Sequence, residues 1–264
     1  MKDFEPVSLA ALLGLLLIGV AFVWFMPARW AVPLLAGRLN GVQLEQVSGL
    51  LWSGRAGRVL SAKGEELGQL EWQLSRRALL DDTDCVIDLQ GTRLKFHGRM
   101  QGRSATEALW TDVHMRADLG LLNAHLALPG GGQPRGTIKA DVPRAQLQGG
   151  WPLVLDADLD WQDASLRAPR QGDIPLGALR LSLKGNSGVI DGHLADNGDG
   201  PLRIDGTLQL SPLGWRFNAV AAPRRSAPTL TRWLATFGAV DADGVTHIHY
   251  TGGLAATLSG RDHG

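Results

Sequence analysis

Hydrophobic and polar residues alternate along most of the chain that follows residue 41. Leu70, Trp72 and Leu74 are separated by polar residues, so this segment has one apolar and one polar face. Successive side chains of a β-strand point to opposite faces, and a period of two is therefore the pattern of a half-buried strand. The pattern recurs in residues 42–47, 92–100, 113–121, 136–142, 152–161, 179–185, 201–211 and 244–254. It predicts a mainly β fold with a predominantly antiparallel sheet.

Turn signals separate these segments. Residues 129–134, 149–150 and 197–200 are rich in Gly, Pro and Asn, which tolerate or favour the dihedral angles of turns. They indicate loops within one β-rich region, because no change in composition marks a second domain.

One short helix is predicted near the C-terminus. Its apolar residues recur at helical spacing, at Leu230, Trp233, Leu234 and Phe237. Ser226 or Thr229 is available as the N-cap, and Gly238 as the stop signal. We expect this helix to cover one end of the sheet.

The run Val7–Met26 carries no charge, and it has the length of a helix that crosses a bilayer, roughly 20 residues. A cleaved signal peptide would have a basic start and a shorter apolar core, whereas here Lys2 is offset by acidic neighbours. The run is therefore interpreted as a single transmembrane helix that ends near Pro27. Charges near its two ends nearly match, so the positive-inside rule leaves the orientation open.

These patterns divide the chain into five segments. A short start (residues 1–6) precedes the transmembrane helix (7–26), and a juxtamembrane segment (27–41) follows it. The β-rich domain then extends over residues 42–258, and the tail 259–264 is expected to fray because it has no apolar face to bury.

Charge and cysteine content exclude several classes of protein. Lys+Arg and Asp+Glu number 26 each, with no basic stripe, so nucleic acid is not an expected partner. Cys85 is the single cysteine, which excludes an intramolecular disulfide and a thiolate zinc cluster. Folding must therefore rest on burial and strand pairing.

The stretch "VSGLLWSGRAG", residues 47–57, raises the question of a functional loop. It lacks the Gly-Lys-[Ser/Thr] of a phosphate-binding P-loop. Neither Ser48 nor Ser53 is flanked by the glycines of a nucleophile elbow. A turn between strands remains, in which Gly49 and Gly54 permit a bend and Trp52 packs against the sheet.

The sequence evidence for a metal site is equally weak. The acidic run Asp156–Asp160 resembles the start of a calcium loop, but Trp161 stands at the glycine position and Arg167 at the bidentate glutamate position. His247 and His249 share one side of a predicted strand without an evident third ligand. We expect no enzyme activity, no metal and no cofactor, and the roles of Cys85 and these two histidines stay open.

Several motifs together resemble a known family. The most specific are Gly49, Trp52 and Gly54, then Trp72, then Gly150-Trp151-Pro152 through Trp161, within a Trp- and Gly-rich β region. With the single apolar run they make the chain similar to type II secretion system protein N over nearly its whole length. Leu50 and Arg76 depart from the residues common in that family, threonine and proline, without removing a chemical group.

The resemblance implies an accessory inner-membrane subunit that acts by protein–protein contact in the export of folded proteins through the outer membrane. It implies a cytoplasmic start at 1–6, one anchor, and a periplasmic domain at 42–258. It also implies other inner-membrane and periplasmic secretion components as partners.

An alternative function is that of a lipid-contacting or lipid-shielding envelope protein. The family is distantly similar to envelope proteins that shield lipid in an elongated folded-over sheet, a β-groove. A sheet with one continuous apolar face must fold over, pack a helix or bind something, so a groove suits the pattern. A periplasmic hydrolase that depends on Ser53 is a third hypothesis. Exported substrates, contact surfaces and stoichiometry are not encoded in any recognisable motif.

Overall fold

The computed structural model describes residues 25–30, 41–80, 82–104, 106–121, 132–168 and 172–253. The chain divides into two compact units, Met1–Gly91 and Thr92–Gly264. Both units are built mainly from antiparallel strands, so the predicted fold class is confirmed for the described residues.

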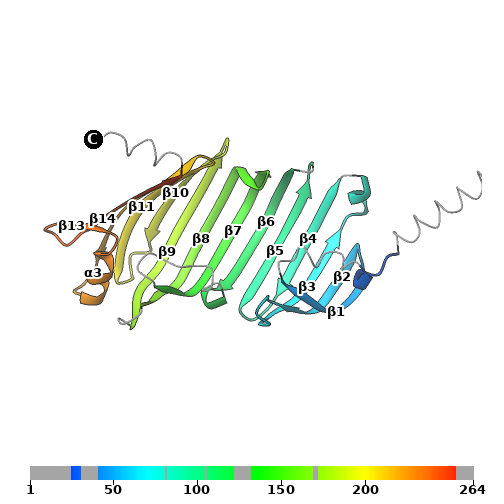
Figure 1. Ribbon diagram of the computed structural model, residues 1–264, viewed down its shortest axis with the longest axis horizontal. Helices are drawn as coiled ribbons and strands as arrows, with labels where there is room; N and C mark the ends of the chain where they lie inside the picture. The colour runs from blue at the N-terminus through cyan, green and yellow to red at the C-terminus, as the bar shows by residue number, and fades with distance from the viewer. Residues whose placement is uncertain are drawn as a thin grey trace, which may run out of the picture. The chain divides into compact units, whose positions relative to one another are not determined.

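The first unit is a sheet in which β1 to β4 are neighbours in chain order (Figure 1). A turn at Leu51 and Trp52 joins the first two strands, and Pro27 forms an isolated bridge with Leu50 at the free edge of β1. The elements are β1 (Gln43–Leu50), β2 (Ser53–Leu60), β3 (Glu66–Leu74), the 3-10 helix η2 (Arg76–Leu80) and β4 (Thr83–Gln90).

The second unit follows the same meander, because β5 to β12 are also neighbours in chain order. Beyond them, β14 pairs with β12 on one side and with β13 on the other. The elements are β5 (Leu94–Gly102), β6 (Glu107–Asp118), η3 (Leu119–Leu121), β7 (Gln133–Gln148), β8 (Trp151–Ala168), β9 (Gly172–Asn186), β10 (Val189–Asp196), β11 (Leu202–Ser211), β12 (Gly214–Pro223), α3 (Pro228–Leu234), β13 (Gly238–Val240) and β14 (Thr246–Gly253).

The sheet of the second unit bends sharply where it carries its core. β8 and β14 are five positions apart in the strand order, roughly 24 Å in a flat sheet, yet Leu166 of β8 and Ile248 of β14 belong to one hydrophobic core. The bend lets α3 pack against both β9 and β12. The hydrophobic core lies in this bend and consists of Ala164, Leu166, Ala168, Ile174, Leu176, Leu179, Leu202, Ile204, Ala219, Ala221, Leu230, Leu234 and Ile248.

The predicted helix is present, but its predicted ends are wrong. Its N-cap is Ala227, whose methyl side chain has no atom that could accept a capping hydrogen bond, and Pro228 follows at the start of the helix, where proline is well tolerated. The helix ends at Leu234, and Phe237 still donates its N–H to the Leu234 carbonyl at 2.9 Å in a following turn. Gly238 instead begins β13.

The predicted membrane anchor and the predicted frayed tail lie outside the described residues, apart from Phe25 and Met26. Among the residues that the structure does describe, no helix has the length and apolar character needed to cross a bilayer.

Candidate functional site

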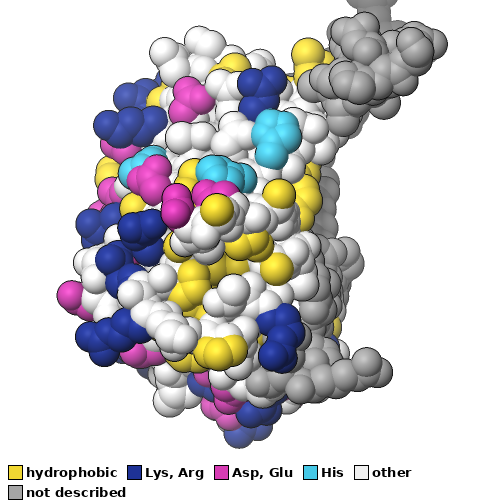
Figure 2. All heavy atoms as spheres, turned by 90° about the vertical axis from the view of Figure 1, so that its left-hand side faces the viewer, with side chains coloured by type: hydrophobic (Ala, Val, Ile, Leu, Met, Phe, Trp, Pro, Cys, Tyr) yellow, Lys and Arg dark blue, Asp and Glu magenta, His cyan; other side chains and the backbone are white. Residues whose placement is uncertain are grey.

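A hydrophobic hollow lies in the second unit, between the bent sheet and α3. It encloses about 400 Å³, and every residue that lines it is aliphatic or aromatic. Figure 2 views the end of the molecule that carries α3, β13 and β14, where hydrophobic side chains gather in a recess with charged side chains around it. Residues of β8 to β12, β14 and α3 contribute to the lining, among them Trp161, Leu194, Phe217, Trp233 and Tyr250.

The hollow exists because α3 covers only part of the apolar face. Leu230 and Leu234 on this seven-residue helix are each 2% exposed and complete the core. Trp233 and Phe237 are only partly buried and line the hollow together with Leu234. Their rings meet edge to face, with centroids 4.7 Å apart, a favoured arrangement for aromatic pairs.

The interior of the hollow is suited to an apolar group. The buried Nε1 of Trp233 has no hydrogen-bond partner within the described part of the chain, and an unsatisfied donor costs free energy. Trp161, which also lines the hollow, donates from Nε1 to the Arg135 carbonyl at 2.9 Å. Ligand pockets of this kind have volumes of about 300–1,000 Å³. The hollow can therefore accommodate a hydrocarbon group, but its lining carries no charged residue that could act in catalysis.

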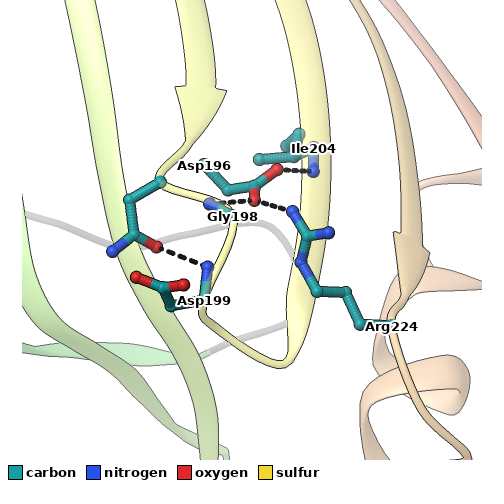
Figure 3. A network of polar contacts seen from close by, with 6 residues as sticks. Asp196, Gly198, Asp199, Ile204 and Arg224 are labelled. Carbon is teal, nitrogen blue, oxygen red and sulfur yellow. Dashed lines mark hydrogen bonds and ion pairs between the residues drawn. The ribbon is translucent and has the colours of Figure 1, made fainter.

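The buried carboxylate of Asp196 stabilises the loop between β10 and β11, beside the core. Figure 3 shows Asp196 accepting hydrogen bonds from the backbone N–H groups of Ile204 at 2.8 Å and Gly198 at 2.9 Å, and pairing with Arg224. The Asp196 side chain is only 5% exposed. Burial acts to raise the pKa of Asp196, but the two N–H groups and the Arg224 guanidinium outweigh it and hold that pKa below its ordinary value. Arg224 directly follows β12, so the pair joins three strands next to α3.

The acidic run on β8 is part of a polar face rather than a calcium loop. Arg180 donates from Nε to Asp160 at 2.7 Å, and the Ser182 hydroxyl donates to Asp158 at 2.5 Å. The hydrogen bond from Arg180 is the main reason that the pKa of Asp160 lies below its usual range. Both partners belong to the neighbouring strand β9, so these carboxylates serve cross-strand pairing.

The two histidines of β14 are bound to different partners. His247 Nε2 lies 3.2 Å from Asp241, while His249 contacts Asn218 on β12. Within the described ranges, no three side chains of His, Cys, Asp or Glu gather closely enough to hold a metal ion.

The structure brings four of the motif residues together in the first unit. Gly49 and Gly54 are paired across the β1–β2 hairpin, and Trp72 pairs with Gly54 from β3. The Trp72 indole lies over Gly54 and donates from Nε1 to the Leu51 carbonyl at 3.0 Å. Trp52, at the turn, is 5% exposed.

Glycine is required at two of these positions. Gly49 has φ +88°, a conformation that side chains rarely adopt. A Cβ on Gly54 would lie 2.4 Å from Cζ2 of Trp72 and 2.9 Å from the Leu50 carbonyl oxygen. The stretch "VSGLLWSGRAG" is thus a tightly packed hairpin.

Among the described residues, no histidine lies beside the serines of this hairpin. Ser48 accepts a hydrogen bond from Arg55 Nε at 3.3 Å. Ser48 and Ser53 line a shallow pocket of about 430 Å³ together with Arg55 and Glu71, and its described lining includes no histidine. The Cys85 thiol is also poorly suited to nucleophilic chemistry, since burial and the neighbouring Asp84 raise its pKa.

The motif residues of the second unit do not form one site. Gly150 lies in the β7–β8 turn, and Trp151 next to it donates from Nε1 to the Gly188 carbonyl at 2.8 Å. Pro152 pairs with Leu147 at a shift in the strand register, where a missing N–H is tolerated. Trp161 lies ten residues after Trp151 on the same strand, roughly 33 Å away at the usual rise, and lines the hollow.

Comparison with known proteins gives a consistent result. A sequence model of the family described as "Type II secretion system (T2SS), protein N" matches residues 40–249. The chain is 27% identical over 247 residues to the Type II secretion system protein N of Klebsiella pneumoniae, a match that covers 88% of this chain and 91% of that protein. It is 29% identical over 255 residues to the protein of the same name from Aeromonas hydrophila, with 94% and 98% covered. No solved structure matches.

Proposed function

The chain belongs to the type II secretion system protein N family, and from this premise we propose that it is an accessory inner-membrane subunit of that system. It acts by protein–protein contact while folded proteins are exported from the periplasm through the outer membrane. The observation that carries this proposal is the extent of the family match, residues 40–249. The matched region contains most of the β structure.

The proposed topology is a cytoplasmic start (1–6), a single membrane anchor (7–26) and a periplasmic β-rich domain (42–258). The anchor is supported by an uncharged run of the length needed to cross a bilayer. A segment in lipid must satisfy its backbone hydrogen bonds internally, and a helix does so.

Deletion of the gene tests the proposed function. We expect a protein normally released by the secretion system to accumulate in the periplasm of the deletion strain, and the full chain to restore its release. As a matched control, a periplasmic protein that is not exported should be unaffected. Undiminished release in the deletion strain, together with no secretion component captured by cross-linking of the native complex, would overturn the proposal.

A second function, the binding of a single acyl chain, is supported by the hydrophobic hollow. Its lining is wholly aliphatic and aromatic, and its volume of about 400 Å³ falls within the range of ligand pockets. Burying a methylene group contributes about 0.8 kcal/mol, so an acyl chain gains most from such a site.

Photo-crosslinking tests this second function. Cells supplied with a diazirine fatty acid should give lipid adducts on peptides from β9 to β11 after irradiation. Ile204→Trp, which fills the hollow, should remove these adducts, whereas Leu213→Trp at a 65% exposed position should retain them. Equal adduct formation in both variants would exclude the hollow as the lipid site.

A further inference from the structure

The first unit exposes a small set of large hydrophobic side chains. Phe25 is 66% exposed, Trp30 50%, Leu79 55% and Leu80 82%. No other large hydrophobic residue described in this unit is exposed to this degree. The two leucines end η2, a 3-10 helix without a buried residue. Exposure of apolar side chains to water is unfavourable. A patch with two adjacent exposed leucines therefore usually marks a contact surface.

Hydrogen bonds place these residues at one end of the strands. The Leu51 N–H donates to the Met26 carbonyl at 2.9 Å, and the Leu74 N–H donates to the Trp52 carbonyl at 2.7 Å. Residues 26–27, the β1–β2 turn and the end of β3 are therefore side by side, and η2 begins directly after β3. Three strand spacings separate Met26 from the end of β3, roughly 15 Å.

The location of Met26 indicates that the exposed hydrophobic residues of the first unit contact the membrane. Met26 is the last residue of the uncharged run Val7–Met26, and its carbonyl is fixed to this end of the first unit. If the run spans the inner membrane, the bilayer surface lies within a residue or two of the strand ends that carry η2. Aromatic residues such as Phe25 and Trp30 are typical of the layer between lipid tails and water.

Charges near η2 are balanced rather than basic. Arg77 lies 3.8 Å from Asp82, and both side chains are largely exposed. Arg76 on η2 and Asp84 at the start of β4 add one charge of each sign. Attraction to anionic headgroups would therefore be weak, and burial of apolar side chains in the interfacial layer would dominate.

We propose that Leu79 and Leu80 insert into the interfacial layer of the leaflet from which the chain emerges, as a second membrane contact of the first unit. This inference rests on the proposed anchor. With the second contact on η2, which follows the end of β3 roughly 15 Å from Met26, the ends of β1 to β4 lie on the bilayer, and the unit cannot swing freely about the anchor.

A fluorescence experiment on the full chain in lipid vesicles tests the contact. In a Cys85→Ser background, which removes the single cysteine, Leu80→Cys carries a polarity-sensitive nitrobenzoxadiazole label. Lys63→Cys is the matched control, because it lies in the exposed β2–β3 turn at the opposite end of the strands. We expect a blue shift and quenching by spin-labelled phosphatidylcholine at position 80 and neither at position 63. The quenching should persist when anionic lipid is omitted.

The outcomes separate this inference from the proposed anchor. If the protein resists carbonate extraction but the label at position 80 is as unquenched as that at position 63, the anchor stands and the second contact is refuted. If carbonate releases the protein, or its N-terminus has been cleaved, the anchor itself fails and the second contact fails with it. If Leu79→Ser with Leu80→Ser leaves quenching of a label at Ala78→Cys unchanged, insertion by the two leucines is also refuted.

Discussion

At the scale of single residues, tryptophans connect neighbouring parts of the sheet. Trp72, Trp151 and Trp161 each donate their indole N–H to a backbone carbonyl outside their own strand. A buried indole normally finds such a partner. The sequence indicated which tryptophans were specific to the family, but not their acceptors, because the residues that provide the carbonyls carry no pattern of their own.

Trp52 and Ser53 should respond very differently to substitution. Trp52 is 5% exposed at the β1–β2 turn, and truncation of a buried aromatic typically costs about 3–5 kcal/mol. We expect Trp52→Ala to lower the free energy of unfolding and the level of folded protein. Ser53→Ala should stay within about 0.5 kcal/mol of wild type. Urea unfolding followed by circular dichroism compares them, and loss of secretion in Ser53→Ala with unchanged unfolding would make this hairpin a functional site.

Gly54 tests whether close packing of the hairpin is essential. An added Cβ would lie 2.4 Å from the Trp72 ring and 2.9 Å from a backbone oxygen, and overpacking of this kind costs about 1–3 kcal/mol. Gly54→Ala should therefore lower the urea midpoint. The double variant Gly54→Ala with Trp72→Leu should lose less than the two single variants added together, since the clash is removed. Simple additivity would show that Trp72 does not restrict position 54.

At the scale of elements, the Asp196 network should make stability depend on pH. The pKa of Asp196 is lowered in the folded protein, so its carboxylate contributes stability above the unfolded pKa of about 3.9. That contribution is lost as the pH falls through the folded value. We expect Asp196→Asn to lose about 1–3 kcal/mol near neutral pH, with a gap to wild type that narrows below about pH 4.

Urea unfolding at a series of pH values measures this gap. Asp199→Asn is the matched control, because Asp199 lies in the same loop and contributes only its backbone N–H to the network (Figure 3). Its unfolding should follow that of wild type. A gap for Asp196→Asn that is constant from neutral to acidic pH would mean that the charge of Asp196 is not what stabilises the loop.

The alternation of residues predicted regular strands better than irregular ones. β11 keeps a period of two in its burial, and this strand was predicted. In β2, the buried residues Ala56 and Val59 are three positions apart, because the register shifts between them. Such a bulge breaks the period, and no single-residue pattern marks its position. The predicted start of α3 was wrong because the N-cap is Ala227, a residue that carries no capping side chain and hence no N-cap signal.

At the scale of the whole molecule, the need to cover an apolar face was predictable, but the hollow was not. Its walls combine residues as far apart as Trp161 and Tyr250, which meet only because the sheet bends. The length of α3 then determines how much of the apolar face of the sheet remains uncovered. Asp196 and Arg224 are 28 residues apart. Apart from the turn residues at 197–200, no sequence pattern predicted that they would form a pair.

The membrane topology is the broadest prediction. If residues 7–26 span the inner membrane with residues 1–6 in the cytoplasm, the chain must end in the periplasm, since only one apolar run of sufficient length is present. Alkaline phosphatase fused after Gly264 should be active, and β-galactosidase at the same place should be inactive. Mass spectrometry should find Met1 or Lys2 at the mature N-terminus. An active β-galactosidase fusion would reverse the orientation, and an N-terminus beyond residue 26 would show that the run is a cleaved signal and that the β-rich domain has no anchor.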